Sequence, residues 1–351
     1  MKQVIGVAII GAGYWGPNLI RTFMSLPDCQ LRWVCDKKPG RLQYVHEKWP
    51  NIPLTDDYRT VLSDPRVDAV VIATPISTHY PLATEALEMG KHVLVEKPLA
   101  TTSAEAQSLV EQAERLRRII ATGHIFVYHP AVVAMKTLIQ QNAIGDLCYV
   151  ESSRVNLGPP ASERNVVWDL AVHDISIVFY LWGREPLEVI AYGRRFRHPR
   201  LTDVAFLSLH FADGSFTQHH VSWLCPEKVR RFFVVGTRGS LLFDDTLPHG
   251  KLRFIDQGID SRIDLKDEEA KELYYQPGQV IVPELPPEEP LHVECQHFLD
   301  CIRTGQRPRA DGYAGLAVVR ILEAAEESIA TGAQPIRLSG VFSKKKYSPN
   351  A

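Results

Sequence analysis

A glycine-rich segment near the start of the chain has the residue types and spacing of a dinucleotide-binding loop. Gly11-Ala12-Gly13-Tyr14-Trp15-Gly16 is a GxGxxG sequence that directly follows the apolar run Val4–Ile10 and opens a helix-like segment. In such a loop the first glycine permits the tight turn, the second lets the backbone approach a pyrophosphate, and the third allows close helix–strand packing. A purely structural loop is the alternative. The strand–turn–helix context favours dinucleotide binding through these residues: Gly11, Gly13, Tyr14, Trp15 and Gly16.

An acidic residue, Asp36, lies 20 residues beyond Gly16, at the end of the next apolar run. Its carboxylate is expected to accept hydrogen bonds from the adenosine ribose and to repel a 2′-phosphate, which favours NAD over NADP. Three nearby cations, at Lys37, Lys38 and Arg41, could instead hold that phosphate or be solvated turn residues. The sequence therefore predicts NAD and leaves NADP possible.

The second chemical signal is Glu96-Lys97-Pro98, which follows the apolar run His92–Val95. In open α/β sheets, ligands lie beyond the carboxyl ends of the strands, so Lys97 is expected to point toward the nicotinamide end of the cofactor. The proline restricts the backbone here. A lysine after a strand is usually just solvated, and its role depends on the third signal.

The third signal is Trp168-Asp169-Leu170-Ala171-Val172-His173-Asp174. On a helix, Asp169 and His173 are four residues apart and share one face. A carboxylate beside an imidazole holds its tautomer and raises its basicity, which suits proton transfer from an alcohol. The alternative is an ion pair on the helix surface.

The first third of the chain alternates short apolar runs with amphipathic segments, which predicts a doubly wound parallel sheet. The expected strands are Val4–Ile10, Leu31–Cys35, Ala69–Ala73, His92–Val95 and Ile119–Thr122, and the expected helices are Asn18–Met24, Gly40–Lys48, Thr78–Met89 and Ser103–Leu116.

After Thr122 the strands follow one another with few helices between them, which predicts a second, α+β domain on an antiparallel sheet. Residues 256–290 are polar and proline-rich and are expected to form a long excursion. The expected strands are Leu147–Asn156, Leu187–Tyr192, Val204–Phe211, Ser215–Trp223, Arg231–Val235 and Ser240–Phe243, and the expected helices are Ala131–Gln141, Trp168–Leu181, Leu291–Thr304 and Tyr313–Thr331.

Composition excludes several classes of protein. The chain has 351 residues, 45% of them hydrophobic, and a net charge of -2, so it is expected to be globular and not to bind nucleic acid. Its apolar runs are too short to span a bilayer. The six cysteines have no metal-type spacing, so we expect reduced thiols, no metal site and a cytoplasmic location.

These motifs, in this order, resemble the Gfo/Idh/MocA family of oxidoreductases. The resemblance rests on the glycine loop, Ala73-Thr74-Pro75 with His79, Glu96-Lys97-Pro98, Asp169 with His173, and a C-terminal stretch from His297 through Gly312. It implies a Rossmann domain at 1–123 and a substrate-binding α+β domain at 124–351. Family members use NAD or NADP on a sugar, inositol or sugar nucleotide, and form dimers or tetramers through the C-terminal sheet. It adds Thr74, Pro75, His79, Glu96 and Lys97 to the expected cofactor site.

A narrower resemblance is to the branch acting on UDP-N-acetylated sugars. It rests on Tyr14-Trp15-Gly16-Pro17-Asn18, on Gly123-His124 with His129-Pro130, and on Asn156-Leu157-Gly158 followed by Trp168-Asp169-Leu170. That branch oxidises C3 of the sugar. The chain departs from its pattern at His129, where asparagine is common, and at Val172, where proline is common, and either change could mean a different sugar.

The resemblance implies hydride transfer from a hydroxyl-bearing ring carbon, with His173 as the leading general base, Asp169 orienting it, and Lys97 hydrogen-bonding the reacting oxygen. Either His173 or Lys97 could accept the proton first. Two alternatives remain: a dehydrogenase of a free sugar or inositol, and a non-catalytic NAD-binding regulator. Asn165 could instead cap a helix and Trp168 could be core. The expected substrate-binding residues are Tyr128, His129, Asn156, Arg164, Asn165 and Trp168.

Overall fold

A computed structural model describes residues 4–158, 164–258 and 278–338. The chain divides into two compact units. Unit 1 comprises residues 1–129 and 288–323, and unit 2 comprises residues 130–287 and 324–351.

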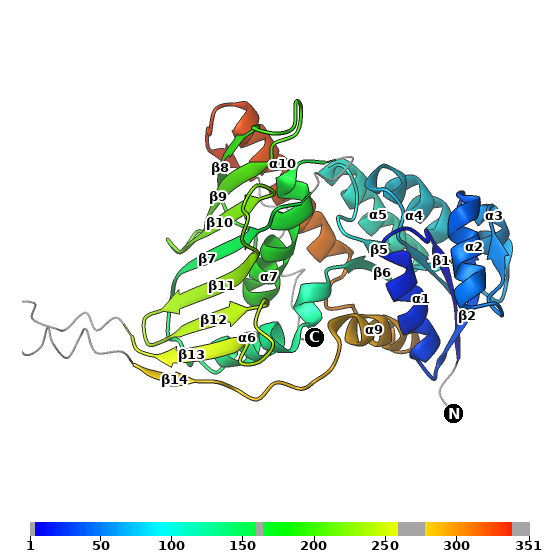
Figure 1. Cartoon of the computed structure of the whole chain (residues 1–351), viewed down its shortest axis with the longest axis horizontal. Helices are drawn as coiled ribbons and strands as arrows, with labels where there is room; N and C mark the ends of the chain where they lie inside the picture. The colour runs from blue at the N-terminus through cyan, green and yellow to red at the C-terminus, as the bar shows by residue number, and fades with distance from the viewer. Residues whose placement is uncertain (1–3, 159–163, 259–277, 339–351) are drawn as a thin grey trace, which may run out of the picture. The chain divides into compact units, whose positions relative to one another are not determined.

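Unit 1 is built on a six-stranded parallel sheet with the strand order β3-β2-β1-β4-β5-β6 (Figure 1). This is the order of a doubly wound dinucleotide-binding sheet, which confirms the predicted fold class. Strand β1 is buried along its whole length, as expected for a strand covered on both faces. The strands are β1 (Ile5–Ile10), β2 (Cys29–Cys35), β3 (Leu54–Thr55), β4 (Ala69–Ile72), β5 (His92–Glu96) and β6 (Ile120–Gly123).

The helices of unit 1 begin where the sequence supplies a start signal. Proline stands in the first turn of α1 and of α2, and the hydroxyl of Thr102 accepts a hydrogen bond from the Glu105 amide to cap α5. The sequence analysis missed β3 and α3, which are two and six residues long. The helices are α1 (Gly16–Ser25), α2 (Pro39–Lys48), α3 (Tyr58–Ser63), α4 (His79–Glu88) and α5 (Ser103–Leu116), with 3-10 turns η1 (Ile76–Thr78) and η2 (Ile125–Tyr128).

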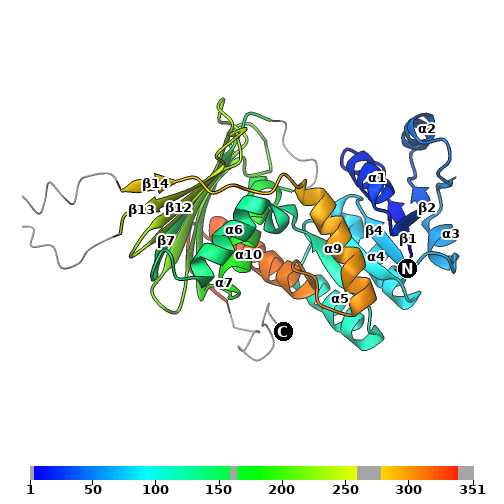
Figure 2. The same cartoon turned by 90° about the horizontal axis from the view of Figure 1, so that it is seen from below.

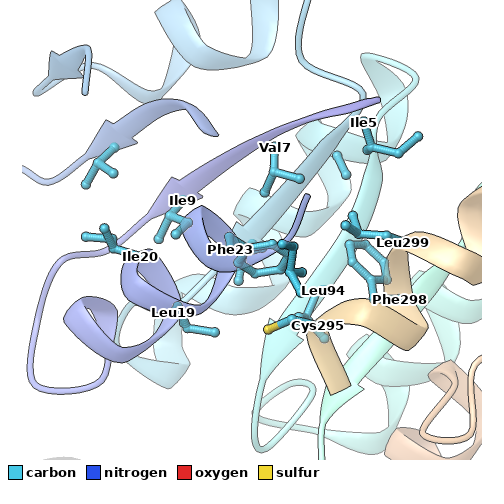
Figure 3. Close-up of a cluster of buried hydrophobic side chains, with 14 of the residues drawn as sticks. Ile5, Val7, Ile9, Leu19, Ile20, Phe23, Leu94, Cys295, Phe298 and Leu299 are labelled. Carbon is cyan, nitrogen blue, oxygen red and sulfur yellow. The ribbon is translucent and has the colours of Figure 1, made fainter. Parts of the chain in front are cut away.

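A helix from the C-terminal part of the chain, α9 (Pro290–Thr304), completes the core of unit 1. Its buried stripe packs with side chains of β1, α1 and β5 in one cluster (Figure 3). For this reason residues 288–323 group with the Rossmann sheet, which differs from the single boundary expected between residues 123 and 124. The stripe consists of Leu291, Cys295, Phe298 and Leu299.

Unit 2 is built on a nine-stranded sheet with the order β14-β13-β12-β11-β7-β10-β9-β8-β15. All neighbours pair antiparallel except β7 and β10, which are parallel. This confirms the predicted α+β domain on an open, mainly antiparallel sheet. The strands are β7 (Leu147–Val155), β8 (Glu188–Arg194), β9 (Val204–His210), β10 (Phe216–Ser222), β11 (Val229–Gly236), β12 (Ser240–Asp244), β13 (Leu252–Asp256), β14 (Gln279–Ile281) and β15 (Ile336–Arg337).

Strands β13, β14 and β15 were not expected. Strand β14 falls in the excursion expected over 256–290, of which residues 259–277 lie outside the described part. Helices α6 (Pro130–Gln140) and α7 (Val172–Trp182) lie on one face of the sheet (Figure 2). The last helix, α10 (Gly312–Ala330), spans the division between the units. None of the helices in the described ranges combines the length and apolar character that a bilayer crossing requires.

Candidate active site

The glycine loop of unit 1 has the backbone that the motif predicts. Gly11 has a φ of +107°, and a Cβ there would lie 2.4 Å from the carbonyl oxygen of Ala73. A Cβ at Gly16 would lie 2.6 Å from the carbonyl oxygen of Gly11. At Gly13 the nearest atoms belong to the flexible Arg41 side chain, at 3.4 Å or more. The turn therefore requires glycine at positions 11 and 16, and Gly13 leaves the backbone open to a phosphate.

Asp36 is held at the end of β2 by contacts on both carboxylate oxygens. Oδ2 accepts hydrogen bonds from the Ala12 amide at 2.8 Å and from Arg41 Nη1 at 3.1 Å, and Oδ1 accepts one from the Lys38 amide at 2.9 Å. The acid predicted to bind ribose therefore also fixes the glycine loop. Arg41, one of the three cations that could hold a 2′-phosphate, lies beside it as an ion-pair partner.

Glu96 and Trp15, both predicted to bind cofactor, bind one another. The partly buried Glu96 carboxylate accepts a hydrogen bond from the Trp15 side chain and another from the Lys97 amide at 3.2 Å. Burial raises the pKa of Glu96 to about 7, while Lys97 and these hydrogen bonds act in the opposite direction. Glu96 thus ties the glycine loop to the end of β5. The Lys97-Pro98 peptide bond is cis.

His79 bridges the segments that follow β4 and β5. Its buried ring places Nδ1 2.8 Å from the carbonyl oxygen of Pro98 and Nε2 2.9 Å from that of Thr74. Thr74 Oγ1 also accepts a hydrogen bond from Thr78 Oγ1 at 2.7 Å. These contacts show His79 supporting the backbone of the predicted site. Tyr14, by contrast, is 96% exposed, so its side chain is accessible to a ligand.

In unit 2, Asp169 and His173 occupy two different kinds of helix. Asp169 lies in a π-helical turn, Val167–Ala171, and His173 lies in the first turn of α7. The regular α-helical spacing assumed from the sequence is therefore wrong at this point. The Asp169 carboxylate accepts a hydrogen bond from Trp223 Nε1 at 3.0 Å, so the residue that directly follows β10 orients it.

A buried polar network holds the start of α7 beneath His173, and the sequence analysis missed it. Arg154 donates from Nε and Nη2 to Asp174 Oδ1, at 3.0 and 2.8 Å. Ser152 Oγ lies 3.0 Å from Asp174 Oδ2 and 2.7 Å from His219 Nδ1, and His219 Nε2 lies 2.8 Å from Thr217 Oγ1. Burial lowers the pKa of His219 to about 4, so this ring is neutral. Alternation on β7 and β10 could have indicated that these polar side chains point inward.

Two predicted substrate residues lie in unit 1, at the end of η2. The Tyr128 hydroxyl lies 3.2 Å from His297 Nδ1 and 3.4 Å from the Ala310 amide, and the Arg309 guanidinium covers its ring at 4.9 Å. Tyr128 is buried, and His129 stacks on Phe126 with ring centroids 6.5 Å apart. These contacts favour a packing role for Tyr128.

Three of the remaining predicted substrate residues surround Glu326 in unit 2. Trp168 Nε1 and Asn165 Nδ2 donate to its carboxylate at 3.0 and 2.9 Å, and Arg164 forms an ion pair with it at 3.8 Å. Asn165 Oδ1 also accepts from the Val167 amide at 3.0 Å, which is the capping role weighed above. Asn156 lies apart from this group, and its backbone N–H donates to the backbone carbonyl oxygen of Ser222 at 3.0 Å. Within the described ranges, no group of His, Cys, Asp and Glu could hold a metal ion.

Unit 1 has a parallel sheet with a glycine loop and Asp36, and unit 2 has a mixed sheet with Asp169 and His173 on a helical segment. These features define a nucleotide-dependent oxidoreductase. Residues 5–124 match the oxidoreductase family with an NAD-binding Rossmann fold, and residues 132–242 match the GFO/IDH/MocA C-terminal domain. The chain therefore belongs to the Gfo/Idh/MocA family.

Three similar proteins illustrate its place in the family. The scyllo-inositol 2-dehydrogenase (NAD(+)) of Bacillus subtilis (strain 168) is 29% identical over 88% of this chain and 89% of its own length. The UDP-N-acetylglucosamine 3-dehydrogenase of Acidithiobacillus ferrooxidans is 38% identical over 53% of this chain and 56% of its own length. The crystal structure of GenD2 from gentamicin A biosynthesis, in complex with NAD, has a TM-score of 0.81 at 25% identity and covers 97% of this chain and 98% of that one.

The cofactor of this chain is NAD. The described residues fit it because Gly11 and Gly16 stand where a Cβ would meet backbone, and because Asp36 presents a buried carboxylate beside the loop. The residues that would hold it in unit 1 are the glycine loop, Asp36, and the segments that follow β4 and β5.

Proposed function

We propose that the chain is a dehydrogenase that oxidises a hydroxyl-bearing ring carbon of a nucleotide-linked sugar, at C3 of a UDP-N-acetyl sugar. The observation that carries this proposal is the 38% identity to a UDP-N-acetylglucosamine 3-dehydrogenase over half of the chain. It is supported by an acid and a histidine at the start of α7, of a type suited to removing a proton from an alcohol.

In this reaction the bond between the ring carbon and its hydrogen breaks, and the hydroxyl oxygen loses its proton as the carbonyl forms. NAD, when bound, supplies the hydride acceptor. His173 takes the proton, and Asp169, itself held by Trp223, orients the imidazole. Lys97 hydrogen-bonds the reacting oxygen and stabilises its developing negative charge.

Direct substrate contacts are assigned to His129, Asn156 and Arg164, whereas the contacts of Tyr128 give that residue a packing role. Arg164 is suited to a diphosphate, because its guanidinium is partly exposed and a guanidinium presents paired N–H donors that match phosphate oxygens. Asn165 and Trp168 act by shaping the segment that carries Arg164, since their polar atoms bond Glu326. Asn156 and His129 are assigned to sugar hydroxyls or the acetamido group.

A second candidate function is oxidation of a free inositol. It is favoured by the 29% identity to a scyllo-inositol 2-dehydrogenase, which extends over 88% of the chain. A non-catalytic NAD-binding regulator would have no use for the lysine, aspartate and histidine together.

The deciding experiment offers the purified protein NAD with UDP-N-acetylglucosamine, its uronic acid, scyllo-inositol or myo-inositol, and follows NADH by absorbance. We expect NADH formation with a UDP-sugar, and increased thermal stability when that sugar and NAD are both present. Turnover of an inositol but of no UDP-sugar would replace the first proposal with the second. Cofactor binding with no turnover of either class would favour the regulator.

We further propose that two copies associate through the face of the unit 2 sheet opposite α6 and α7. On β9, Ala205, Leu207 and Leu209 point into the unit, and Phe206, 48% exposed, points away. Phe206 stacks on His220 with ring centroids 4.4 Å apart. Phe216 stacks on Tyr149 and His210, at 5.8 and 6.3 Å. Aromatic side chains in adjacent stacks on an exposed sheet face are typical of an interface.

A further inference from the structure

A buried histidine stands directly beside Lys97 at the edge of the unit 1 sheet. In the parallel pairing of β5 with β6, Glu96 lies opposite Gly123, so the next residues, Lys97 and His124, leave adjacent strands side by side. Lys97 also acts electrostatically on the His124 ring. His124 therefore belongs to the same end of the sheet as the proposed catalytic lysine.

The His124 ring has no hydrogen-bond partner in the part of the chain that the structure describes. The residue is 1% exposed, and among the described residues neither ring nitrogen has a bonding partner. Buried polar groups in proteins are nearly always paired, and leaving one unpaired destabilises the fold. A ring with two such atoms is disfavoured in the protein alone, so its retention points to a partner outside the chain.

The ring is neutral when it meets that partner. Burial and, to a smaller extent, the charge of Lys97 together lower the pKa of His124 to about 3. A neutral imidazole carries one N–H donor and one acceptor nitrogen. The two ring nitrogens point in different directions, so each needs its own partner: an acceptor for the N–H and a donor for the other nitrogen.

The location limits what that partner is. The glycine loop after β1 takes the pyrophosphate, and Asp36 at the end of β2 takes the adenosine ribose, so the other half of the dinucleotide lies over the ends of β4, β5 and β6. His124 follows β6 and Lys97 follows β5. The reacting end of the cofactor and the substrate carbon that it serves belong at this place.

We propose that His124 is a ligand-binding residue, one ring nitrogen of which forms a hydrogen bond with a neutral group of the bound cofactor or substrate. Two groups in the reaction have that chemistry: the carboxamide of the nicotinamide and a hydroxyl of the substrate. The substrate arm of this inference rests on the proposed function, whereas the carboxamide arm rests on NAD binding alone.

The test compares His124→Leu, which removes both polar atoms at similar volume, with His124→Gln, which keeps a donor and an acceptor. Thermal unfolding is measured without ligand, the NADH dissociation constant by fluorescence titration, and the KM of the sugar by turnover. The matched control is His92→Leu. His92 starts β5 at the opposite end of the same sheet, and its Nδ1 accepts a hydrogen bond from the Ile119 amide at 2.9 Å.

We expect His124→Leu to unfold at the wild-type temperature or above it, because the unpaired groups are gone. It should raise either the NADH dissociation constant or the KM of the sugar by about tenfold, the effect of losing one hydrogen bond. Weaker NADH binding identifies the carboxamide, and a raised KM alone identifies the substrate hydroxyl. His124→Gln should restore most of the loss. His92→Leu should unfold at a lower temperature and bind both ligands normally.

The inference is overturned if His124→Leu loses thermal stability as His92→Leu does while NADH binding and KM stay at wild-type values. That result would make the ring a core residue. If the wild type binds NADH but oxidises no sugar, the proposed function fails separately, and the NADH titration alone decides: unchanged affinity then overturns the inference.

Discussion

The Nδ1 atom of His79 lies 2.8 Å from the carbonyl oxygen of Pro98, one residue after Lys97. The other ring nitrogen lies 2.9 Å from the carbonyl oxygen of Thr74. One imidazole thus joins the segments that follow β4 and β5, on which two groups of predicted cofactor residues stand. Because the ring is buried, the position of Lys97 depends on a side chain whose two ring nitrogens both lie against backbone.

The first prediction concerns this bridge. His79→Phe removes both polar contacts while keeping a ring, and we expect a loss of about 1–3 kcal/mol in the free energy of unfolding for the carbonyl groups left unpaired. We also expect kcat to fall about tenfold as the segment carrying Lys97 loosens, with a smaller effect on the NADH dissociation constant. Urea unfolding, steady-state kinetics and NADH titration measure the three effects. Weakened NADH binding at unchanged kcat would instead make His79 a cofactor contact.

The second prediction separates catalysis from cofactor binding at Lys97. Removing a proton-transfer or charge-stabilising group typically costs about 10²–10⁴-fold in rate, so Lys97→Ala should lower kcat by at least the smaller factor. NAD affinity should stay close to the wild-type value, because the glycine loop and Asp36 are intact. Steady-state turnover and NAD affinity are measured on the same preparation. The control variant is Lys91→Ala, which removes a lysine that donates to the carbonyl oxygens of Asp64 and Val67. A large loss of NAD binding would show that Lys97 mainly holds cofactor.

The elements of unit 1 were predictable because the signals for them are local. Continuous apolar runs specify the buried strands, and the glycine spacing specifies the turn after β1. Strand β3 has two residues and pairs only with the end of β2, so no periodicity could reveal it. The grouping of α9 with unit 1 depends on packing between segments more than 250 residues apart, which no local pattern encodes.

The site residues could be predicted because they follow the carboxyl ends of predicted strands. Their hydrogen-bond partners could not be predicted in this way. Hydrogen bonds such as Trp15 to Glu96 join distant segments, and they show that some residues chosen as ligand contacts support the backbone of the site. The π-helical turn at Asp169 was missed because a period of 3.6 residues was assumed throughout. Both errors arise where tertiary contacts override a local rule.

The third prediction uses the partly buried carboxyl of Glu96. Its pKa is raised from 4.5 to about 7, so between these values the folded protein binds a proton that the unfolded chain has lost. Stability from this group is full below pH 4.5, falls as pH rises through 7, and is then constant. Glu96→Gln has no such dependence and still accepts the Trp15 hydrogen bond. The free energy of unfolding of this variant, relative to that of the wild type, should therefore rise by about 3 kcal/mol between pH 4.5 and pH 8. Denaturant unfolding of both proteins at the two pH values checks this prediction. The same difference in the free energy of unfolding at both pH values would contradict a raised pKa of Glu96.

The fourth prediction concerns the ion pair beneath His173. Asp174 and Arg154 have side chains 1% and 5% exposed, so removing one partner leaves a buried charge uncompensated. Asp174→Asn should cost about 3–5 kcal/mol in the free energy of unfolding. The double variant Asp174→Leu with Arg154→Met removes both charges and should recover most of that loss. Equal destabilisation by the single and double variants would show that shape, rather than charge pairing, is what the network supplies.

The last prediction tests the aromatic face of the unit 2 sheet. Phe206 and Phe216 are 48% and 36% exposed and point away from α6 and α7. Lysine at both positions places two charges per copy where a second copy would bury them, and a buried unpaired charge costs several kcal/mol. Light scattering during size-exclusion chromatography should show an oligomer for the wild type and a monomer for Phe206→Lys with Phe216→Lys. Exposed sites of this kind tolerate substitution, so the NADH dissociation constant of the variant should match that of the wild type and report that unit 1 is folded. An oligomer of unchanged size in the variant would exclude this face as the interface.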